Sequence, residues 1–367
     1  MLGVVTLLVG LAAQPGPEIQ LYTMGEGQNV WERYGHAALC VRYSPGQGQD
    51  ACYNWGTFDF TDQAKMALGI LREEPVFWVS ARPPHVLLSG YRRFDRTIWR
   101  QVLPLSPSAK AQLVAELKEN ILPENRRYVY NYISDNCSTR IRDIISRFLP
   151  GTLSERTEPM PYTYRDMVRK GVADSRLTLA LIDFFVGRSV DRSPTAYESA
   201  LLPTRLRVLV EQELGVKPEV LYERKGPPLR TTPLPHSFLF MLVALAIGFP
   251  IWAASFLGRF RRVGLWISVL LLFVVSVVLW TLAAVSSIDE FRYNEVLLLF
   301  LPTDLLLLTR WRKAYALLRL ASIALVSLLA ALGVLVQPLF VIALIPTLTM
   351  IEALRSDLSK VLRESHY

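Results

Sequence analysis

Apolar residues are distributed very unevenly along this chain. Leu, Val, Ala, Ile and Phe dominate from Ser237 onward, whereas the residues up to about His236 have the mixed composition of a globular protein. Overall, 51% of the residues are hydrophobic and the mean hydropathy is +0.27, which is high for a soluble protein. The distribution predicts a mixed domain of roughly 220 residues, large enough for its own core, followed by a membrane domain of roughly 130 residues.

The predicted membrane domain contains four apolar runs: Phe238–Leu257, Leu265–Val285, Ala314–Val336 and the shorter Leu339–Leu354. A membrane-spanning helix needs about 20 apolar residues to cross about 30 Å of hydrocarbon. Between the second and third runs lies Val296–Leu308, which is short and contains Pro302 and Asp304. This composition predicts a kinked span or a re-entrant segment.

The basic clusters of the membrane domain favour the crossing alternative. They are "GRFRR" (Gly258–Arg262), "RWRK" (Arg310–Lys313) and "RSDLSKVLR" (Arg355–Arg363). If Val296–Leu308 crosses, there are about five spans and all three clusters lie on one side, as the positive-inside rule requires. If it does not cross, the first two clusters face opposite sides. We therefore expect about five spans, and the net charge of +8 then reflects membrane topology and not nucleic-acid binding.

These observations divide the chain into consecutive parts. We expect a signal peptide or N-terminal anchor over residues 1–14, an extracytoplasmic domain over 15–224, a linker over 225–236, a transmembrane domain over 237–355 and a cytoplasmic tail over 356–367. The N-terminal stretch has an apolar core and small residues near Ala12–Ala13, as a signal peptide does, but it lacks a basic start.

The mixed domain contains signals for both strands and helices. "ERYGHAALCVRYS" (Glu32–Ser44) and "ACYNWGTFDF" (Ala51–Phe60) are strand-like and are joined by a Pro/Gly-rich turn, so they predict a β-hairpin. "YRRFDRTIWRQVLPL" (Tyr91–Leu105) predicts a further strand. Leu105–Leu122 predicts a helix with Ser106 as N-cap and Pro107 at its first position. The expected fold class is α+β, followed by an all-α polytopic membrane domain.

A cysteine lies where another helix is expected to begin. "CSTRIRDIISRFLP" (Cys137–Pro150) places Ile141, Ile144, Ile145 and Phe148 on one face, and Asp135 or Asn136 can cap its start. Unpaired amides and the helix macrodipole favour a thiolate at such a position. The same amides can hold an oxyanion. Cys137 is therefore a candidate nucleophile, with an inert core cysteine as the alternative.

A nucleophilic cysteine needs a base, and the mixed domain offers His36 and His85 ahead of the linker. His36 follows "RYG" at a strand start, where Gly35, Ala37 and Ala38 leave room for a partner. His85 follows "RPP" in a loop-like run. We expect His36 to pair with Cys137, with a surface or structural histidine as the alternative. No CxxC or HExxH occurs in the sequence, so no metal site is expected.

Several stretches in the same order resemble the Lnb-type lipoprotein N-acyltransferase family. They are "YGHAALCVRY", "ACYNWGTFDF", "NRRYVYNYISDNCSTRIRD", "YTYRDMV" and "IDFFVGRSVDRSPTAYESALLPTRL", and they extend over about residues 18–230. The resemblance implies a periplasmic domain similar to circularly permuted NlpC-like, papain-type cysteine enzymes. It also implies that Cys137 is the nucleophile and His36 the base.

"FRYNEVLLLFLPTDLLLL" (Phe291–Leu308) is similar to the membrane segment of the same family. Asn294 and Glu295 are accordingly candidate substrate-binding residues, although "YNE" departs from the fuller Asn-Glu-Asn run expected there. Asp304 is a further candidate, because an acid inside an apolar segment is often functional; alternatively it reaches the lipid headgroups. Arg140 is expected to pair with Asp143 or to meet a lipid phosphate.

The third member of the site is expected on the second hairpin strand. In an oxidising compartment, Cys40 and Cys52 can form a disulfide across the hairpin. That pairing would place Gly56 opposite His36 and make Asn54 the diagonal neighbour on the same sheet face. Asn54 is then the candidate that orients the imidazole, or alternatively it serves only a bulge or turn. Cys137 is left as the free thiol.

The resemblance implies an acyl transfer without cofactors. The acyl chain of a phospholipid would pass through a Cys137 thioester to the α-amine of a diacylglyceryl-cysteine lipoprotein, in a multi-pass protein of the bacterial inner membrane with its catalytic domain in the periplasm. Two other readings stay open. One is a membrane-anchored cysteine hydrolase acting on lipid esters or peptidoglycan peptides. The other is a non-catalytic lipid- or lipoprotein-binding module.

Overall fold

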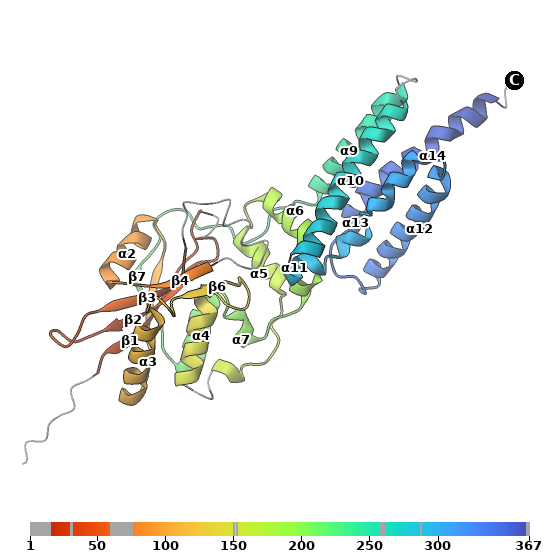
Figure 1. Ribbon diagram of the computed structural model, residues 1–367. Coiled ribbons are helices and arrows are strands. Elements are labelled where there is room, and N and C mark those ends of the chain that lie inside the picture. Colours follow the sequence, from red (N-terminus) through yellow and green to blue (C-terminus); the bar gives the residue numbers. More distant parts are fainter. Residues whose placement is uncertain are drawn as a thin grey trace, which may run out of the picture. The chain divides into compact units, whose positions relative to one another are not determined.

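The protein is described from a computed structural model, which describes residues 16–29, 32–58, 76–149, 151, 153–256, 261–286 and 288–364. The signal peptide or anchor expected over residues 1–14 lies outside them. The chain forms two compact units (Figure 1). The sheet unit contains the described residues up to Phe58, Val76–Thr157 and Ala196–Pro227, and the helical unit contains Glu158–Thr195 and the chain from Pro228 onward.

The extracytoplasmic range expected over 15–224 contains residues of both units. Residues Glu158–Thr195 belong to the helical unit because their apolar side chains share its core. Ala180 is buried in the same cluster as Phe240 and Leu272, and Phe184 packs against that cluster. The expected range was set by the overall polarity of the chain. Polarity alone does not show in which core these few apolar residues are buried.

The sheet unit is built on one antiparallel sheet of seven strands in the order β6-β4-β3-β2-β1-β5-β7. Its strands are β1 (Glu18–Met24), β2 (His36–Arg42), β3 (Ala51–Thr57), β4 (Val76–Arg82), β5 (Ile98–Val102), β6 (Arg127–Val129) and β7 (Glu219–Tyr222). The predicted hairpin is β2–β3. The strand predicted over Tyr91–Leu105 is shortened to β5, because Tyr91–Arg93 end a helix that the sequence did not predict.

That helix is α2 (Pro84–Arg93), and it covers one face of the sheet through Leu87. Pro84 occupies its first turn, where proline is tolerated because the first amides of a helix have no partner within it. His85 therefore lies in a helix and not in the expected loop. It is an exposed residue.

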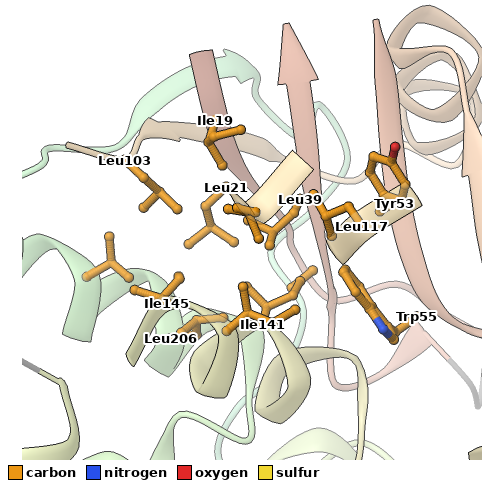
Figure 2. Packing of buried hydrophobic residues seen from close by; sticks show 14 of the residues in the cluster. Ile19, Leu21, Leu39, Tyr53, Trp55, Leu103, Leu117, Ile141, Ile145 and Leu206 are labelled. Carbon is orange, nitrogen blue, oxygen red and sulfur yellow. The ribbon is translucent and has the colours of Figure 1, made fainter. Parts of the chain in front are cut away.

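The other helices of the sheet unit are α3 (Pro107–Asn120), α4 (Cys137–Phe148), α7 (Ala196–Ser199) and α8 (Pro203–Leu214), with a 3-10 turn η2 (Leu153–Glu155). Ser106 caps α3 by accepting from the Ala109 amide, as predicted. The main core lies between the sheet and α3, α4 and α8 (Figure 2). Ile141 and Ile145 of α4 pack there with Leu39 of β2 and Trp55 of β3, which fixes the Cys137 helix against the two hairpin strands.

The helical unit contains the apolar part of the chain. Its elements are α5 (Tyr164–Gly171), α6 (Arg176–Phe185), η3 (Arg188–Asp191), α9 (Phe238–Phe256), α10 (Arg261–Val285), α11 (Asp289–Arg292), η4 (Glu295–Leu298), η5 (Pro302–Leu308), α12 (Arg312–Ala331), α13 (Leu339–Ile342) and α14 (Leu344–Glu364). Two described helical stretches are long and apolar enough to cross a membrane: Arg262–Val285 and Arg312–Ala331. Phe238–Pro250 and Leu339–Leu354 are shorter apolar helices.

The short apolar segment between α10 and α12 is not a continuous helix. It consists of the 3-10 turns η4 and η5 with Leu299–Leu301 between them. Its start lies beside the chain that follows α12, because Glu295 accepts from the Gln337 amide. Its later part lies beside the first half of α12, because Asp304 accepts from Tyr315. The segment therefore runs antiparallel to α12 and brings Arg310–Lys313 to the opposite end of that helix from Glu295.

The unwound backbone of this segment is satisfied by side chains. Arg319 donates to the Leu299 carbonyl at 2.7 Å, and the Trp280 indole donates to the Phe300 carbonyl at 2.8 Å. Non-helical backbone inside a membrane requires partners of this kind. Asp304 is fully buried and accepts from Arg319 Nε at 2.8 Å, so it does not reach the lipid headgroups. The Asp304 carboxylate thus positions Arg319, which in turn donates to the backbone where the helix is interrupted.

We expect Asp304→Ala to destabilise the helical unit strongly. The substitution leaves the Arg319 guanidinium, 2% exposed, without its counter-charge. Breaking a buried ion pair in this way costs about 3–5 kcal/mol. The double variant Asp304→Leu/Arg319→Met should lose less, because no charge stays unpaired. Thermal unfolding in detergent measures both, and an Asp304→Ala protein as stable as the wild type would contradict a structural role for the pair.

The direction of the segment between α10 and α12 also predicts on which side of the membrane its two ends lie. In a Cys137→Ala background, Tyr293→Cys and Trp311→Cys place single thiols at side chains that are 55% and 59% exposed. An impermeant maleimide should label the first from the outer side and the second only from the cytoplasmic side. Labelling of both from one side would show that the segment returns to the face it left.

Candidate active site

Cys137 is the first residue of α4, and its position depends on the cap before it. Asn136 accepts from the Ser138 and Thr139 amides at 2.8 and 3.0 Å, and Thr139 Oγ1 accepts from the Asn136 amide at 2.7 Å. Asn136, and not Asp135, is therefore the cap. Because Asn136 also donates to the Tyr132 and Leu201 carbonyls, the helix start is tied to two other parts of the chain.

His36 is the first residue of β2. Two glycines lie close to its side chain or backbone: Gly35 directly before it and Gly56 in β3. Gly35 has a φ of +80°, and a Cβ there would lie 2.8 Å from the Met24 carbonyl oxygen, so only glycine fits this entry into the strand. Gly56 has a φ of +88°, and a Cβ there would lie 3.9 Å from both Cys137 Cβ and His36 Cε1. The two reactive side chains thus converge over the bare backbone of Gly56.

The hairpin register brings Asn54 to His36, as the sequence predicted. Leu39, Cys40 and Val41 pair with Tyr53, Cys52 and Ala51, and Cys40 and Cys52 form the expected disulfide. Asn54 Oδ1 hydrogen-bonds to His36 Nε2. An amide oxygen only accepts, so Nε2 carries a proton and Nδ1 is left to face the thiol. Among the described residues, Cys137 is the free cysteine.

A second layer of polar side chains holds Asn54, and the sequence did not indicate it. Asn54 Nδ2 donates to Thr57 Oγ1 at 3.2 Å, and Thr57 Oγ1 hydrogen-bonds to Ser80 Oγ at 2.8 Å. These bonds fix which end of the amide faces the imidazole. The β3–β4 register shifts between Asn54 and Thr57, next to Gly56. A glycine inside a strand pattern can signal such an irregularity.

The environment of Cys137 makes its thiol acidic. Burial by itself raises the pKa of the thiol, but the charge and hydrogen bond of His36, with the Ala37 amide and the Ser138 hydroxyl, outweigh burial and lower it below its usual value. The thiolate form of Cys137 is therefore favoured. Tyr91 of α2 stacks on His36 with ring centroids 6.0 Å apart, and burial raises the pKa of this phenol, so Tyr91 stays neutral.

Aromatic side chains line the approach to the thiol. The Cys137 amide donates to the Tyr130 hydroxyl, and burial raises the pKa of Tyr130 well above its usual value. The Tyr130 ring contacts Phe77 at 4.3 Å and Tyr132 at 5.2 Å between centroids. Tyr130 thus stands as a neutral hydrogen-bonding group at the helix amide beside the nucleophile. Sequence reasoning did not place Tyr130 or Tyr132 in the site.

Arg140 does not pair with Asp143, the protein partner expected for it. Its guanidinium binds both oxygens of Asp135 at 2.6 and 2.7 Å and lies 3.7 Å from the Tyr128 ring centroid. The predicted pair with Asp143 is wrong, because Asp143 accepts from Arg142 at 2.7 Å. Arg140 therefore braces the turn before the helix.

Asn294 and Glu295 lie in the helical unit and join separate chain segments. Asn294 Nδ2 donates to the Phe184 and Phe185 carbonyls at 2.9 and 3.2 Å, and its Oδ1 accepts from Gln337 Nε2 at 3.1 Å. Glu295 accepts from the Val336 and Gln337 amides, both at 2.9 Å. Their contacts are structural in this unit. Gln337 was missed, although a polar residue in an apolar stretch could have indicated it.

A charged cluster in the helical unit was also missed by sequence reasoning. Arg165 binds Asp191 and the Val186 carbonyl, and Asp183 accepts from Arg169 and lies 2.8 Å from His236 Nε2. These side chains hold α5, α6 and the turn after α6 together. Within the described residues, no group of His, Cys, Asp and Glu side chains could hold a metal ion.

The sheet unit is thus an antiparallel α+β domain in which a helix-start cysteine faces a strand histidine oriented by an asparagine. Residues 16–170 match the family model of the Lnb N-terminal periplasmic domain, which supports an Lnb-type protein. Cys137, His36 and Asn54 all lie in the matched range. No curated protein and no solved structure matches the chain.

The acidity of the thiol can be tested by its alkylation as a function of pH. Because His36 lowers the pKa of Cys137, iodoacetamide should react at a lower pH than with a free cysteine. In His36→Ala the effect of burial is opposed only by the Ala37 amide and the Ser138 hydroxyl, so the profile should move to higher pH. His85→Ala is the matched control. An unchanged profile in His36→Ala would show that His36 does not stabilise the thiolate.

Proposed function

We propose that this protein is a lipoprotein N-acyltransferase that moves an acyl chain from a phospholipid to the α-amine of a diacylglyceryl-cysteine lipoprotein. The observation that carries the proposal is the contact of Cys137 with His36, oriented by Asn54, in a chain that also has long apolar helices. The family match supports it through the periplasmic domain. The order of histidine strand before cysteine helix supports a permuted NlpC-like, papain-type fold.

In the first step the Cys137 thiolate attacks the carbonyl carbon of a phospholipid ester. The carbon–oxygen bond to the glycerol breaks, and the leaving alkoxide takes the proton from the His36 imidazolium. In the second step the lipoprotein α-amine attacks the thioester, His36 takes its proton, and the thiolate leaves. An amide has formed, and the thiolate–imidazolium pair is restored. No cofactor enters either step.

The tetrahedral intermediates of both steps carry an oxyanion. The Cys137 amide is available at the helix start, and the neutral Tyr130 hydroxyl lies beside it. Preorganised donors of this kind stabilise a developing negative charge. In this mechanism the substrate oxygen replaces the Tyr130 oxygen as the acceptor of the amide, and the phenol turns its proton toward the oxyanion.

The proposed substrates explain why the protein needs long apolar helices. Moving a 16-carbon chain from bilayer to water costs about 12 kcal/mol, at about 0.8 kcal/mol per methylene. A reaction between two lipids therefore has to occur where both stay anchored. We accordingly propose a multi-pass protein of the inner membrane, with about five spans and the catalytic domain in the periplasm.

The proposal is tested by trapping the acyl-enzyme. Enzyme incubated with phospholipid alone should gain one acyl mass on the Cys137 peptide, and hydroxylamine should remove it, because thioesters are cleaved and amides are not. A diacylated lipopeptide with a free α-amine should then discharge the enzyme and become N-acylated. An acetylated lipopeptide should not. Mass spectrometry of the peptide and the lipopeptide measures each step.

Variants supply the controls. Cys137→Ala and His36→Ala should abolish both steps, whereas His85→Ala, in the exposed first turn of α2, should leave them unchanged. Steady release of free fatty acid that the lipopeptide does not divert would favour the membrane-anchored cysteine hydrolase. Lipid binding without any acyl-enzyme would favour the non-catalytic binding module.

A further inference from the structure

The helical unit contains an apolar pocket that the proposed chemistry does not use. Its volume is about 560 Å³, which lies within the range of roughly 300–1,000 Å³ that ligand pockets occupy. One face each of α6, α9 and α10 forms its walls, with Phe300 of the unwound segment and Ile345 of α14. Every lining residue is apolar. The pocket therefore suits a hydrocarbon ligand without polar groups along its length.

Aromatic side chains form the inner wall of the pocket. Phe184 of α6 contacts Phe300 and Phe240 with ring centroids 5.4 and 6.3 Å apart. The backbone carbonyls of Phe184 and Phe185 both accept from Asn294. Asn294, expected from the sequence to bind substrate directly, thus holds the aromatic wall in place. Gln337 holds Asn294 in turn.

The outer side of the pocket is open. Leu177, Leu181 and Leu242 line it and are 65%, 46% and 50% exposed. At one end, Arg176 precedes the lining residue Leu177, and its guanidinium lies 5.8 Å from the ring centroid of Phe238, which precedes the lining residue Leu239. Arg176 is an exposed residue. A cation thus stands at the rim of an otherwise apolar pocket.

We propose that this pocket is the binding site for one acyl chain of the phospholipid donor, with Arg176 facing the lipid phosphate. A phospholipid combines an anionic phosphate with a long hydrocarbon chain, which matches the charged rim and the apolar interior. The diacylglyceryl group of the acceptor lipoprotein carries chains but no phosphate, so it matches only the interior. The identity of the lipid as donor rests on the proposed function; the lipid site itself does not.

Binding is tested first, in the full-length Cys137→Ala protein in liposomes, so that no turnover is needed. A phospholipid with a diazirine in its acyl chain should crosslink to the α6, α9 and α10 peptides that line the pocket. The same chain on diacylglycerol should crosslink there less. Arg176→Gln should weaken the phospholipid adduct and leave the diacylglycerol adduct unchanged. Peptide mass spectrometry locates and quantifies the adducts.

Selectivity is tested next with two adjacent positions of α10. Val278 lines the pocket and is 44% exposed, whereas Val277 is 40% exposed and does not line it. Val278→Trp fills the pocket, so the ratio of palmitoyl to lauroyl transfer should fall by about tenfold, as pockets that discriminate methylenes allow. Val277→Trp adds the same ring outside the pocket and should leave the ratio unchanged.

The outcomes separate the two proposals. Crosslinks spread evenly over the exposed faces of α9, α10 and α12 would mean only surrounding lipid and would overturn the site. Equal crosslinking by diacylglycerol, unaffected by Arg176→Gln, would overturn the phospholipid assignment. Pocket adducts in Cys137→Ala, together with no acyl-enzyme in the wild-type protein, would support the lipid site while refuting the N-acyltransferase function. N-acylation without pocket adducts would support the N-acyltransferase function and refute the lipid site.

Discussion

The contact between His36 and Cys137 determines whether the buried thiol is reactive. Burial alone keeps a thiol neutral, and the imidazole reverses that effect. The contact depends on the packing of α4 on β2 and β3 and on Asn136, which starts that helix at Cys137. Core packing and helix capping therefore both act on the ionisation of a single sulfur atom.

Sequence reasoning succeeded where the signals were local. The helix start at Cys137, the β2–β3 hairpin, the disulfide and the approach of Asn54 to His36 all follow from residues close together in the chain. It failed where distant segments meet. The hydroxyl pair of Thr57 and Ser80 depends on how β4 joins the sheet. Arg140 had several acidic neighbours, and only the fold selects Asp135.

In the helical unit, too, the sequence did not reveal contacts between distant residues. Asp304 was noticed because it interrupts an apolar segment, but its partner Arg319 was hidden in a run that still passed as apolar. Asn294 and Glu295 were predicted to bind substrate, and in the structure they connect chain segments by hydrogen bonds. Polar residues in apolar surroundings are easy to find, but their partners decide whether they bind substrate or support the fold.

The disulfide in the hairpin also bears on how the three cysteines pair. Cys40 and Cys52 are only 12 residues apart, so closing their loop costs little entropy. A bridge from either of them to Cys137 would close a much longer loop. Loop entropy therefore favours the one pairing that leaves Cys137 as the free thiol.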